Sequence, residues 1–300
     1  MVEVTCRTVQ GRFLLKPTVN LRSIVIGVLG RAQRLYPVDI HAFVFLSNHY
    51  HLLLSVENAL QLSQFMNFLN SNLAREIGRL HDWRERFWGR RYQAIVISAE
   101  EASQVGRLQY LLSHGCKEGL VARPREWPGA QSVGALADGL ALEGDWFNRT
   151  QENAARARGE VFDTLKYATR ETVELSPLPC WQPLSRKQYQ HRVRELIARI
   201  EAETASRHSR EQSKPLGLKA IFSRHPHDRP SEIKKTWAPA FHAATNAARG
   251  ELVGAYKLFV QGYREAAKRL REGDVRARFP GGSFPPRLPW VDWLLQPAPS

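Results

Sequence analysis

The sequence predicts an α+β fold: a ferredoxin-like, split βαβ antiparallel sheet with helices on one face, followed by a mostly α-helical, basic C-terminal region. Three observations support this prediction. In the first half, β-prone and amphipathic runs follow one another in the order strand, helix, strand, strand, helix, strand, helix. In the second half, the apolar side chains have mainly helical spacing, and that half also holds most of the excess positive charge.

The first strand and the first helix are expected near the N-terminus. Val2–Cys6 and Arg12–Leu15 are β-prone runs on either side of a Gln10-Gly11 turn, and they predict a hairpin or one bent strand. Asn20 has the side chain of an N-cap, and residues 21–35 carry apolar side chains at helical spacing until a proline ends the helix.

Residues 41–55, HAFVFLSNHYHLLLS, predict a tight β-hairpin, because two apolar runs flank a Ser-Asn dipeptide. Asn tolerates the left-handed backbone that a two-residue turn requires. Side chains alternate along a strand, so His49 and His51 point to one face, about 7 Å apart at the backbone, and Tyr50 points to the other. This spacing can chelate a metal ion, although such histidines can also be polar residues on a wet strand face.

A second amphipathic helix is expected over residues 60–80, because its apolar side chains fall on one stripe. Residues 92–98 form another β-prone run. A third helix is expected over residues 101–117, with acidic residues near its start and Gly119 beyond its end. Residues 127–144 carry several glycines and are expected to form an irregular edge of this first domain.

The segment HDWRERFWGRR, residues 81–91, interleaves aromatic rings with arginines. Single-strand binding uses aromatic rings that stack on bases, next to guanidinium groups that bind phosphate. A solvated charged turn with buried Trp rings is the alternative. The predicted DNA-binding residues are Arg84, Arg86, Trp88, Arg90 and Arg91.

Helical periodicity returns over residues 187–206 and 250–271. Between these helices, residues 211–235 are charged and interrupted by prolines, which predicts a linker or an exposed loop. His225-Pro226-His227 repeats the i, i+2 spacing of the hairpin histidines. Because proline cannot donate to a sheet ladder, we expect a loop there.

Length and composition limit the class of protein. The 300 residues, 43% of them hydrophobic, fit a soluble globular protein of one or two domains. No apolar run approaches the roughly 18 to 20 residues that cross a bilayer, and the N-terminus has no apolar signal segment, so we expect a cytoplasmic protein without a membrane partner. The 3 cysteines are far apart and form no CxxC pair, which predicts reduced thiols.

The formal net charge of +14 indicates a polyanionic partner, most often nucleic acid, because binding phosphates releases condensed counterions. The charge is uneven: residues 1–150 carry net +4 and residues 151–300 carry net +10. A basic, solvated surface without a nucleic-acid partner is the alternative.

Two histidines fill too few coordination sites to hold a metal ion rigidly, so a third protein ligand is expected from elsewhere in the fold. His114 is the candidate, because it lies four residues after Tyr110 and therefore on the same face of the expected third helix. Taken alone, Tyr110 would be a core aromatic residue.

The hairpin segment resembles the His-hydrophobic-His hairpin of the HUH nucleases, and in particular the single-tyrosine, insertion-sequence 200-like transposases, with the REP-associated tyrosine transposases as close relatives. FWGRRY resembles the segment before their last core strand, and YLLSHGCKEGLV matches their tyrosine-bearing helix. The resemblance covers about the first 130 residues. It implies Tyr110 as the catalytic nucleophile and His49, His51 and His114 as metal ligands, with histidine at the last position where relatives often carry Asn or Gln.

The resemblance implies a transposase that binds single-stranded, hairpin-forming DNA and cleaves it with a tyrosine and a divalent metal ion, Mg²⁺ or Mn²⁺. Cleavage would give a 5′-phosphotyrosyl bond and a free 3′-OH, and reversal would join strands. Judged by the softness of the ligands alone, three imidazoles would favour zinc, iron or nickel over Mg²⁺ or Mn²⁺. The alternatives are an inactive DNA-binding regulator and a metal-dependent hydrolase that uses water. The sequence leaves monomer and homodimer both open.

These observations together divide the chain into four expected regions. Residues 1–130 would be the HUH single-tyrosine transposase catalytic domain, 131–180 an irregular connection, 181–278 a helical basic accessory region, and 279–300 a Pro-rich tail.

Overall fold

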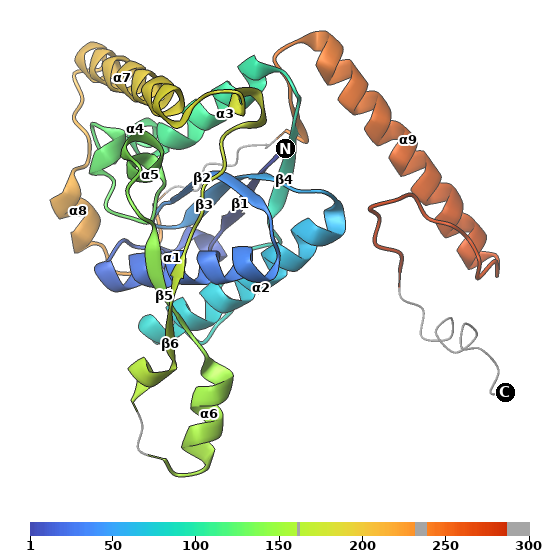
Figure 1. Cartoon of the computed structure of the whole chain (residues 1–300), viewed down its shortest axis with the longest axis horizontal. Coiled ribbons are helices and arrows are strands. Elements are labelled where there is room, and N and C mark those ends of the chain that lie inside the picture. Colours follow the sequence, from blue (N-terminus) through green and yellow to red (C-terminus); the bar gives the residue numbers. More distant parts are fainter. Residues whose placement is uncertain (161–162, 232–238, 287–300) are drawn as a thin grey trace.

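The computed structural model describes residues 1–160, 163–231 and 239–286, and within these ranges the main sheet has five strands in the order β2, β3, β1, β4, β7 (Figure 1). The first four pair antiparallel, whereas β7 joins β4 in parallel. The strands are β1 (Val2–Arg7), β2 (Asp39–Phe45), β3 (His49–Ser55), β4 (Gln93–Ile97) and β7 (Phe241–His242).

Helices cover both faces of this sheet. On one face lie α1 (Val19–Leu35) and α2 (Ala59–Leu80), as Figure 1 shows, and on the other face lies α3 (Glu101–Leu112). β2 and β3 are buried almost throughout, so both of their faces need an apolar cover. The predicted α+β class is confirmed, and the second helical layer adds to the single one that was predicted.

The N-terminal residues form one strand that ends at Arg7, and neither the hairpin nor the bent strand predicted over residues 2–15 is found. After β1, Gln10 and Gly11 take left-handed backbone angles, with φ of 54° and 67°. Residues 12–15 do not form a strand. Leu14 and Leu15 instead bury their side chains in the core beneath the sheet. The β prediction for this run was therefore wrong.

The first helix begins slightly earlier than predicted. Thr18 is its N-cap, since its side-chain oxygen accepts a hydrogen bond of 3.0 Å from the Leu21 N–H, so the assignment of Asn20 was wrong. Asn58 caps α2 in the same way, by accepting from the Gln61 N–H at 2.9 Å.

The helix predicted over 101–117 is divided into two. α3 ends at Leu112, and after Ser113 a single further turn, α4 (His114–Lys117), follows. Gly119, with φ of 68°, then turns the chain away in the left-handed conformation expected just beyond a helix.

Residues 131–180 are not the irregular connection that was predicted. They contain α5 (Val133–Asp138), β5 (Glu143–Phe147), α6 (Arg149–Ala157) and β6 (Ala168–Thr172). β5 and β6 form a two-stranded ribbon that packs on α1. Glycine is required at this contact: a Cβ at Gly27 would lie 2.3 Å from the Asp145 backbone, and one at Gly144 would lie 2.1 Å from the Ser23 carbonyl.

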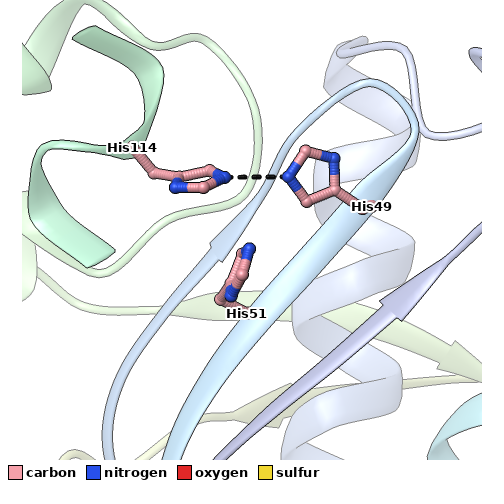
Figure 2. A group of neighbouring side chains, drawn as sticks. All are labelled: His49, His51 and His114. Carbon is pink, nitrogen blue, oxygen red and sulfur yellow. Dashed lines mark hydrogen bonds between the residues drawn. The ribbon is translucent and has the colours of Figure 1, made fainter. Parts of the chain in front are cut away.

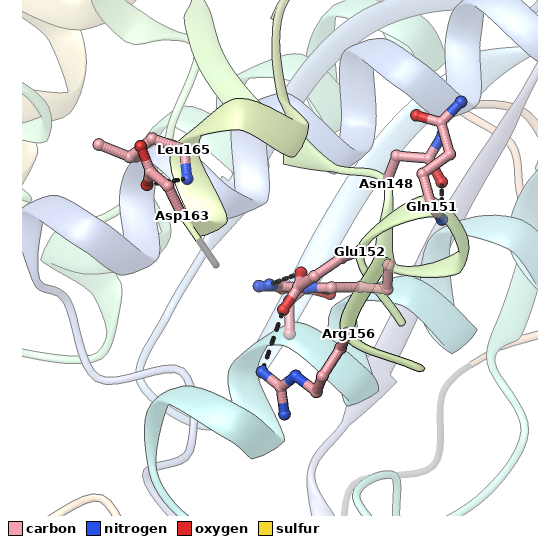
Figure 3. Close-up of polar contacts among 8 residues, drawn as sticks. Asn148, Gln151, Glu152, Arg156, Asp163 and Leu165 are labelled. Carbon is pink, nitrogen blue, oxygen red and sulfur yellow. Dashed lines mark hydrogen bonds and ion pairs between the residues drawn. The ribbon is translucent and has the colours of Figure 1, made fainter. Parts of the chain in front are cut away.

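At the end of this ribbon, α6 projects from the body of the molecule (Figure 1). Figure 3 shows its polar contacts: Asn148 caps the helix by accepting from the Gln151 N–H at 3.2 Å, and Glu152 pairs with Arg156 at 3.7 Å. Arg149 also donates to the buried Glu76 of α2 at 2.9 Å, so α6 is tied to the second helix.

The predicted accessory region is partly built into the first domain. In α7 (Arg186–Arg210) the apolar side chains join the same core as α3. The expected linker contains α8 (Leu218–Ser223) and returns to the first domain, where the Phe13 N–H donates to the Asp228 carbonyl. Positions 225–227 form a loop, as predicted. Residues 232–235 of this linker and 287–300 of the predicted tail lie outside the described residues.

The last helix, α9 (Asn246–Arg271), lies away from the sheet, as Figure 1 shows. Its predicted apolar stripe is only partly covered: Leu270 is buried, whereas Tyr256 is 53% exposed. Its start is tied to the body by Glu100, which accepts a hydrogen bond of 2.6 Å from the Thr245 hydroxyl. Along the described ranges, no helix is long and apolar enough to span a lipid bilayer.

The outer strand β2 has hydrogen-bonded neighbours beyond the sheet. Along β2, Phe43 exchanges two hydrogen bonds of 3.0 Å with Ser132, and the Phe45 N–H donates to the Ala130 carbonyl at 2.9 Å. At the other side of the sheet, β7 pairs with the end of β4 at Val96.

Candidate functional site

The predicted hairpin positions the first two site residues. β2 and β3 are joined by a two-residue turn, which the Leu46 N–H closes by donating to the His49 carbonyl at 2.8 Å. Along β3, His49 and His51 point to the face covered by α3, and Tyr50 is buried in the core on the other face. The alternation predicted from the sequence is therefore confirmed.

Asn48 has a different role in this turn from the one predicted. Its φ is not positive, so the left-handed backbone is not needed. Instead its Nδ2 donates to the Gly11 carbonyl at 3.1 Å, which directs its Oδ1 to the Nδ1 of His49 at 2.7 Å. Because this oxygen can only accept, the proton of His49 lies on Nδ1 and the lone pair lies on Nε2.

His114, the first residue of α4, completes a cluster with the two hairpin histidines (Figure 2). One ligand atom from each of the three residues lies within 4.8 Å of the others, and the Nε2 atoms of His49 and His114 are 2.8 Å apart. His114 Nδ1 is buried and has no hydrogen-bond partner in the described part of the chain. This group of nitrogen donors could hold a metal ion.

The cluster is buried, contrary to the expectation of a wet strand face. His49 is 9% exposed and His114 only 2%, because α3 and α4 cover this side of the sheet. Burial, together with the charge of His51, lowers the pKa of both residues below the usual value for histidine. Both imidazoles are therefore neutral near pH 7, which is the form that binds metals.

Tyr110 lies on α3 one turn before His114, and their ring centroids are 5.1 Å apart. Two cations lie over the Tyr110 ring, with the Arg107 guanidinium 4.0 Å from its centroid and the Lys117 ammonium 4.4 Å from it. Burial and the nearby Glu3 carboxylate raise the pKa of Tyr110, while Arg107 opposes this rise. Tyr110 therefore lies beside the histidines, as its helical spacing from His114 predicted.

Three residues near the cluster were not predicted from the sequence: Glu3, Arg107 and Lys117. Glu3 is fully buried on β1 and contacts both His51 and Arg107. Its position in VEVTC marks it as a polar residue on one face of a strand, but nothing in the sequence states that β1 lies next to β3. Arg107 and Lys117 lie three residues before and seven after Tyr110, a helical spacing that could have indicated them.

The predicted DNA-binding residues lie elsewhere. A groove of about 560 Å³ runs between α2 and the loop 86–92, on the face of the sheet opposite the histidines. Four of the five predicted residues line it, together with polar side chains of α2: Arg86, Trp88, Arg90, Arg91, Ser63, Asn67 and Asn70. Arg84, the fifth, is exposed and pairs with Asp82 at 3.3 Å.

Trp88 in this groove is only half-buried. Its Nε1 donates to the Asn70 carbonyl at 2.9 Å, and its ring stands edge-on to Tyr50, with the centroids 5.5 Å apart. One edge of the indole is therefore fixed to the core while the rest lies along the groove.

Comparison with known proteins identifies part of the chain. Residues 14–111 match the family model of IS200-like transposases, and this span contains His49, His51 and Tyr110. Over this span the chain is similar to the IS200-like transposases. The matched span ends three residues before His114.

Two solved structures are similar to this chain. A REP-associated tyrosine transposase bound to a REP hairpin is 17% identical, with a TM-score of 0.38, over 46% of this chain and 80% of that one. A candidate transposase from Deinococcus radiodurans R1 is 16% identical, with a TM-score of 0.29, over 36% of this chain and 85% of that one. Among curated proteins, no match was found.

Proposed function

We propose that this protein is a transposase that cleaves and rejoins single-stranded DNA through Tyr110, with a divalent metal ion held by His49, His51 and His114. The observation that carries the proposal is the convergence of three buried imidazoles, from a hairpin and a separate helix, beside a tyrosine ring one helical turn away. A structural histidine would not need two others within 4.8 Å.

The chemistry would follow from the arrangement of these residues. When bound, the metal ion would supply a Lewis acid that draws charge from the scissile phosphate. The Tyr110 oxygen attacks the phosphorus, the bond from phosphorus to the 3′ oxygen breaks, and the phenol proton is released as the leaving oxygen gains one. The products are a 5′-phosphotyrosyl bond and a free 3′-OH. Attack by a 3′-OH reverses the step and joins the strands.

Two cations next to Tyr110 support this role. Because burial raises its pKa, the phenol is neutral in the resting site and must lose its proton during attack. Arg107 and Lys117 lie over the ring, where their positive charge favours the phenolate and the negative phosphate in the transition state.

A cleavage assay on the wild-type chain tests this proposal. A labelled single-stranded hairpin oligonucleotide is incubated with Mg²⁺, Mn²⁺ or Zn²⁺, or with a chelator, and the products are separated on a denaturing gel. We expect a metal-dependent band of DNA attached to protein. Nicked DNA without attached protein would favour the water-using hydrolase, and the absence of cleavage with every metal would favour an inactive DNA-binding relative.

We propose further that the groove beside α2 binds the phosphate backbone of the DNA. Its lining combines arginines, amide side chains and the indole of Trp88, which is the composition that single-strand binding uses. The groove lies on the opposite face from the histidine cluster, so it would hold DNA at a distance from the cleaved bond.

The double substitution Arg90→Ala with Arg91→Ala tests the groove. If each arginine neutralises one phosphate, the slope of log affinity against log salt should become shallower by about 1.4 in total, since each single-strand contact contributes about 0.7. Fluorescence anisotropy at several salt concentrations measures this slope. Arg158→Ala is the matched control, because Arg158 is an exposed arginine that pairs with Glu160 and does not line the groove. An unchanged slope in the double variant would place the bound DNA elsewhere.

A further inference from the structure

Glu3 is a carboxylate buried completely within the sheet, with 0% of its surface exposed. A buried charge is costly unless it is paired, and a buried ion pair is weak evidence for a purely stabilising role. The two contacts of Glu3 are therefore informative, because they connect it to both halves of the proposed active site.

The first contact is with His51. β1 and β3 pair with Thr5 opposite His51, so Glu3 and His51 are diagonal neighbours on the same face of the sheet. The Glu3 Oε1 lies 2.7 Å from the Nδ1 of His51. The carboxylate can only accept when ionised, so the His51 proton lies on Nδ1 and its Nε2 is free for the cluster.

This contact repeats the arrangement found at the other hairpin histidine, whose Nδ1 is bound by the Oδ1 of Asn48. In both cases an oxygen acceptor fixes the ring and directs Nε2 inward. The two acceptors differ chemically, since Glu3 offers a carboxylate oxygen and Asn48 an amide oxygen.

The second contact is an ion pair between the other Glu3 oxygen and Arg107. Arg107 is only 15% exposed, and its guanidinium lies 4.0 Å from the centroid of the Tyr110 ring. The two oxygens of the Glu3 carboxylate face the His51 imidazole and the Arg107 guanidinium, one each. Glu3 thus contacts both Arg107, which lies beside the proposed nucleophile, and His51, a proposed metal ligand.

We propose that Glu3 is a positioning residue that fixes two parts of the site together: the His51 imidazole toward the metal ion and, through Arg107, the ring of Tyr110. This inference rests on the proposed function. It implies that metal binding and reaction of the tyrosine depend on one carboxylate that touches neither the ion nor the DNA.

Substitutions at Glu3 in the full-length chain test this role, with Mn²⁺ alone titrated calorimetrically as the first readout. Glu3→Ala should weaken Mn²⁺ binding by about 10- to 100-fold, the range for the loss of a residue that orients a metal ligand. Glu3→Gln should lose less affinity, because its amide oxygen can still accept from the His51 Nδ1–H. Glu76→Gln is the matched control: Glu76 is also buried and paired with an arginine, but it lies on the opposite face of the sheet.

The second readout is the rate of adduct formation at saturating Mn²⁺. Glu3→Gln and Arg107→Ala should both slow it, because each removes the ion pair that holds Arg107 against the Tyr110 ring, while Arg107→Ala should leave Mn²⁺ affinity within a few-fold of wild type. Circular dichroism identifies variants that do not fold, and the conservative Glu3→Gln carries the test if Glu3→Ala is one of them.

The outcomes separate this inference from the proposed function. Wild type that binds Mn²⁺ and forms the adduct, with both readouts unchanged in Glu3→Gln and Glu3→Ala, would overturn the positioning role and leave the proposed function intact. Wild type that binds no Mn²⁺ would overturn the metal site on which the inference rests. A loss of Mn²⁺ affinity as large in Glu76→Gln as in Glu3→Ala would show a general structural effect and would also overturn the inference.

Discussion

Tyr110→Phe is expected to reduce formation of the covalent protein–DNA adduct by at least about 1,000-fold, because the substitution removes the attacking oxygen. The ring, its helix and its contacts with Arg107 and Lys117 remain. Stability should therefore change by no more than about 1 kcal/mol, the contribution of one hydroxyl hydrogen bond. A denaturing gel with a labelled oligonucleotide measures the adduct, and thermal unfolding measures the stability.

Tyr92→Phe provides the control for this experiment. Tyr92 lines the groove beside α2, on the other face of the sheet, so its hydroxyl is not expected to take part in bond cleavage. If Tyr110→Phe still forms the adduct at the wild-type rate, another residue is the nucleophile and the proposed mechanism is wrong.

His114→Ala should have the second largest effect, through the metal. With one of three donors removed, Mn²⁺ affinity should fall by more than about 100-fold, beyond the loss expected for a residue that only orients a ligand. Tyr110 would remain, so adduct formation should be lost at low Mn²⁺ and should partly return at high Mn²⁺. Calorimetric titration and the gel assay together measure both quantities.

His225→Ala is the corresponding control, since His225 lies in the loop 225–227 and outside the cluster. Mn²⁺ binding by His114→Ala that equals wild type would exclude His114 as a ligand. The two remaining histidines would then need another partner for the ion.

The hairpin and its site residues could be predicted because the information is local. Two β-prone runs on either side of a Ser-Asn turn predict the hairpin. Two histidines two residues apart on one of its strands then share a face, whatever the rest of the chain does. Tyr110 and His114 are likewise related by one turn of helix, and the division of that helix at Ser113 leaves their rings in contact.

Features that depend on which segments become neighbours could not be predicted. The contact of Glu3 with His51 requires β1 to lie beside β3, and the burial of the histidines requires α3 to cover their face. The β5–β6 ribbon was missed because the glycine-containing segment 127–144, which leads into β5, indicates an irregular structure. In the fold, Gly144 instead allows two backbones to approach more closely than a Cβ would permit.

The hydrogen bonds along β2 limit how the molecule can assemble. A polypeptide can add to a sheet only where backbone N–H and C=O groups at an edge are unpaired. Along β2, Phe43 is already bonded to Ser132, and Phe45 is bonded to the Ala130 carbonyl and to the Trp127 indole N–H. A second copy of the chain therefore cannot extend the sheet along this part of the strand. A homodimer that used this part of β2 would have to contact it through side chains, and such an interface would be sensitive to substitutions there and insensitive to changes in strand register.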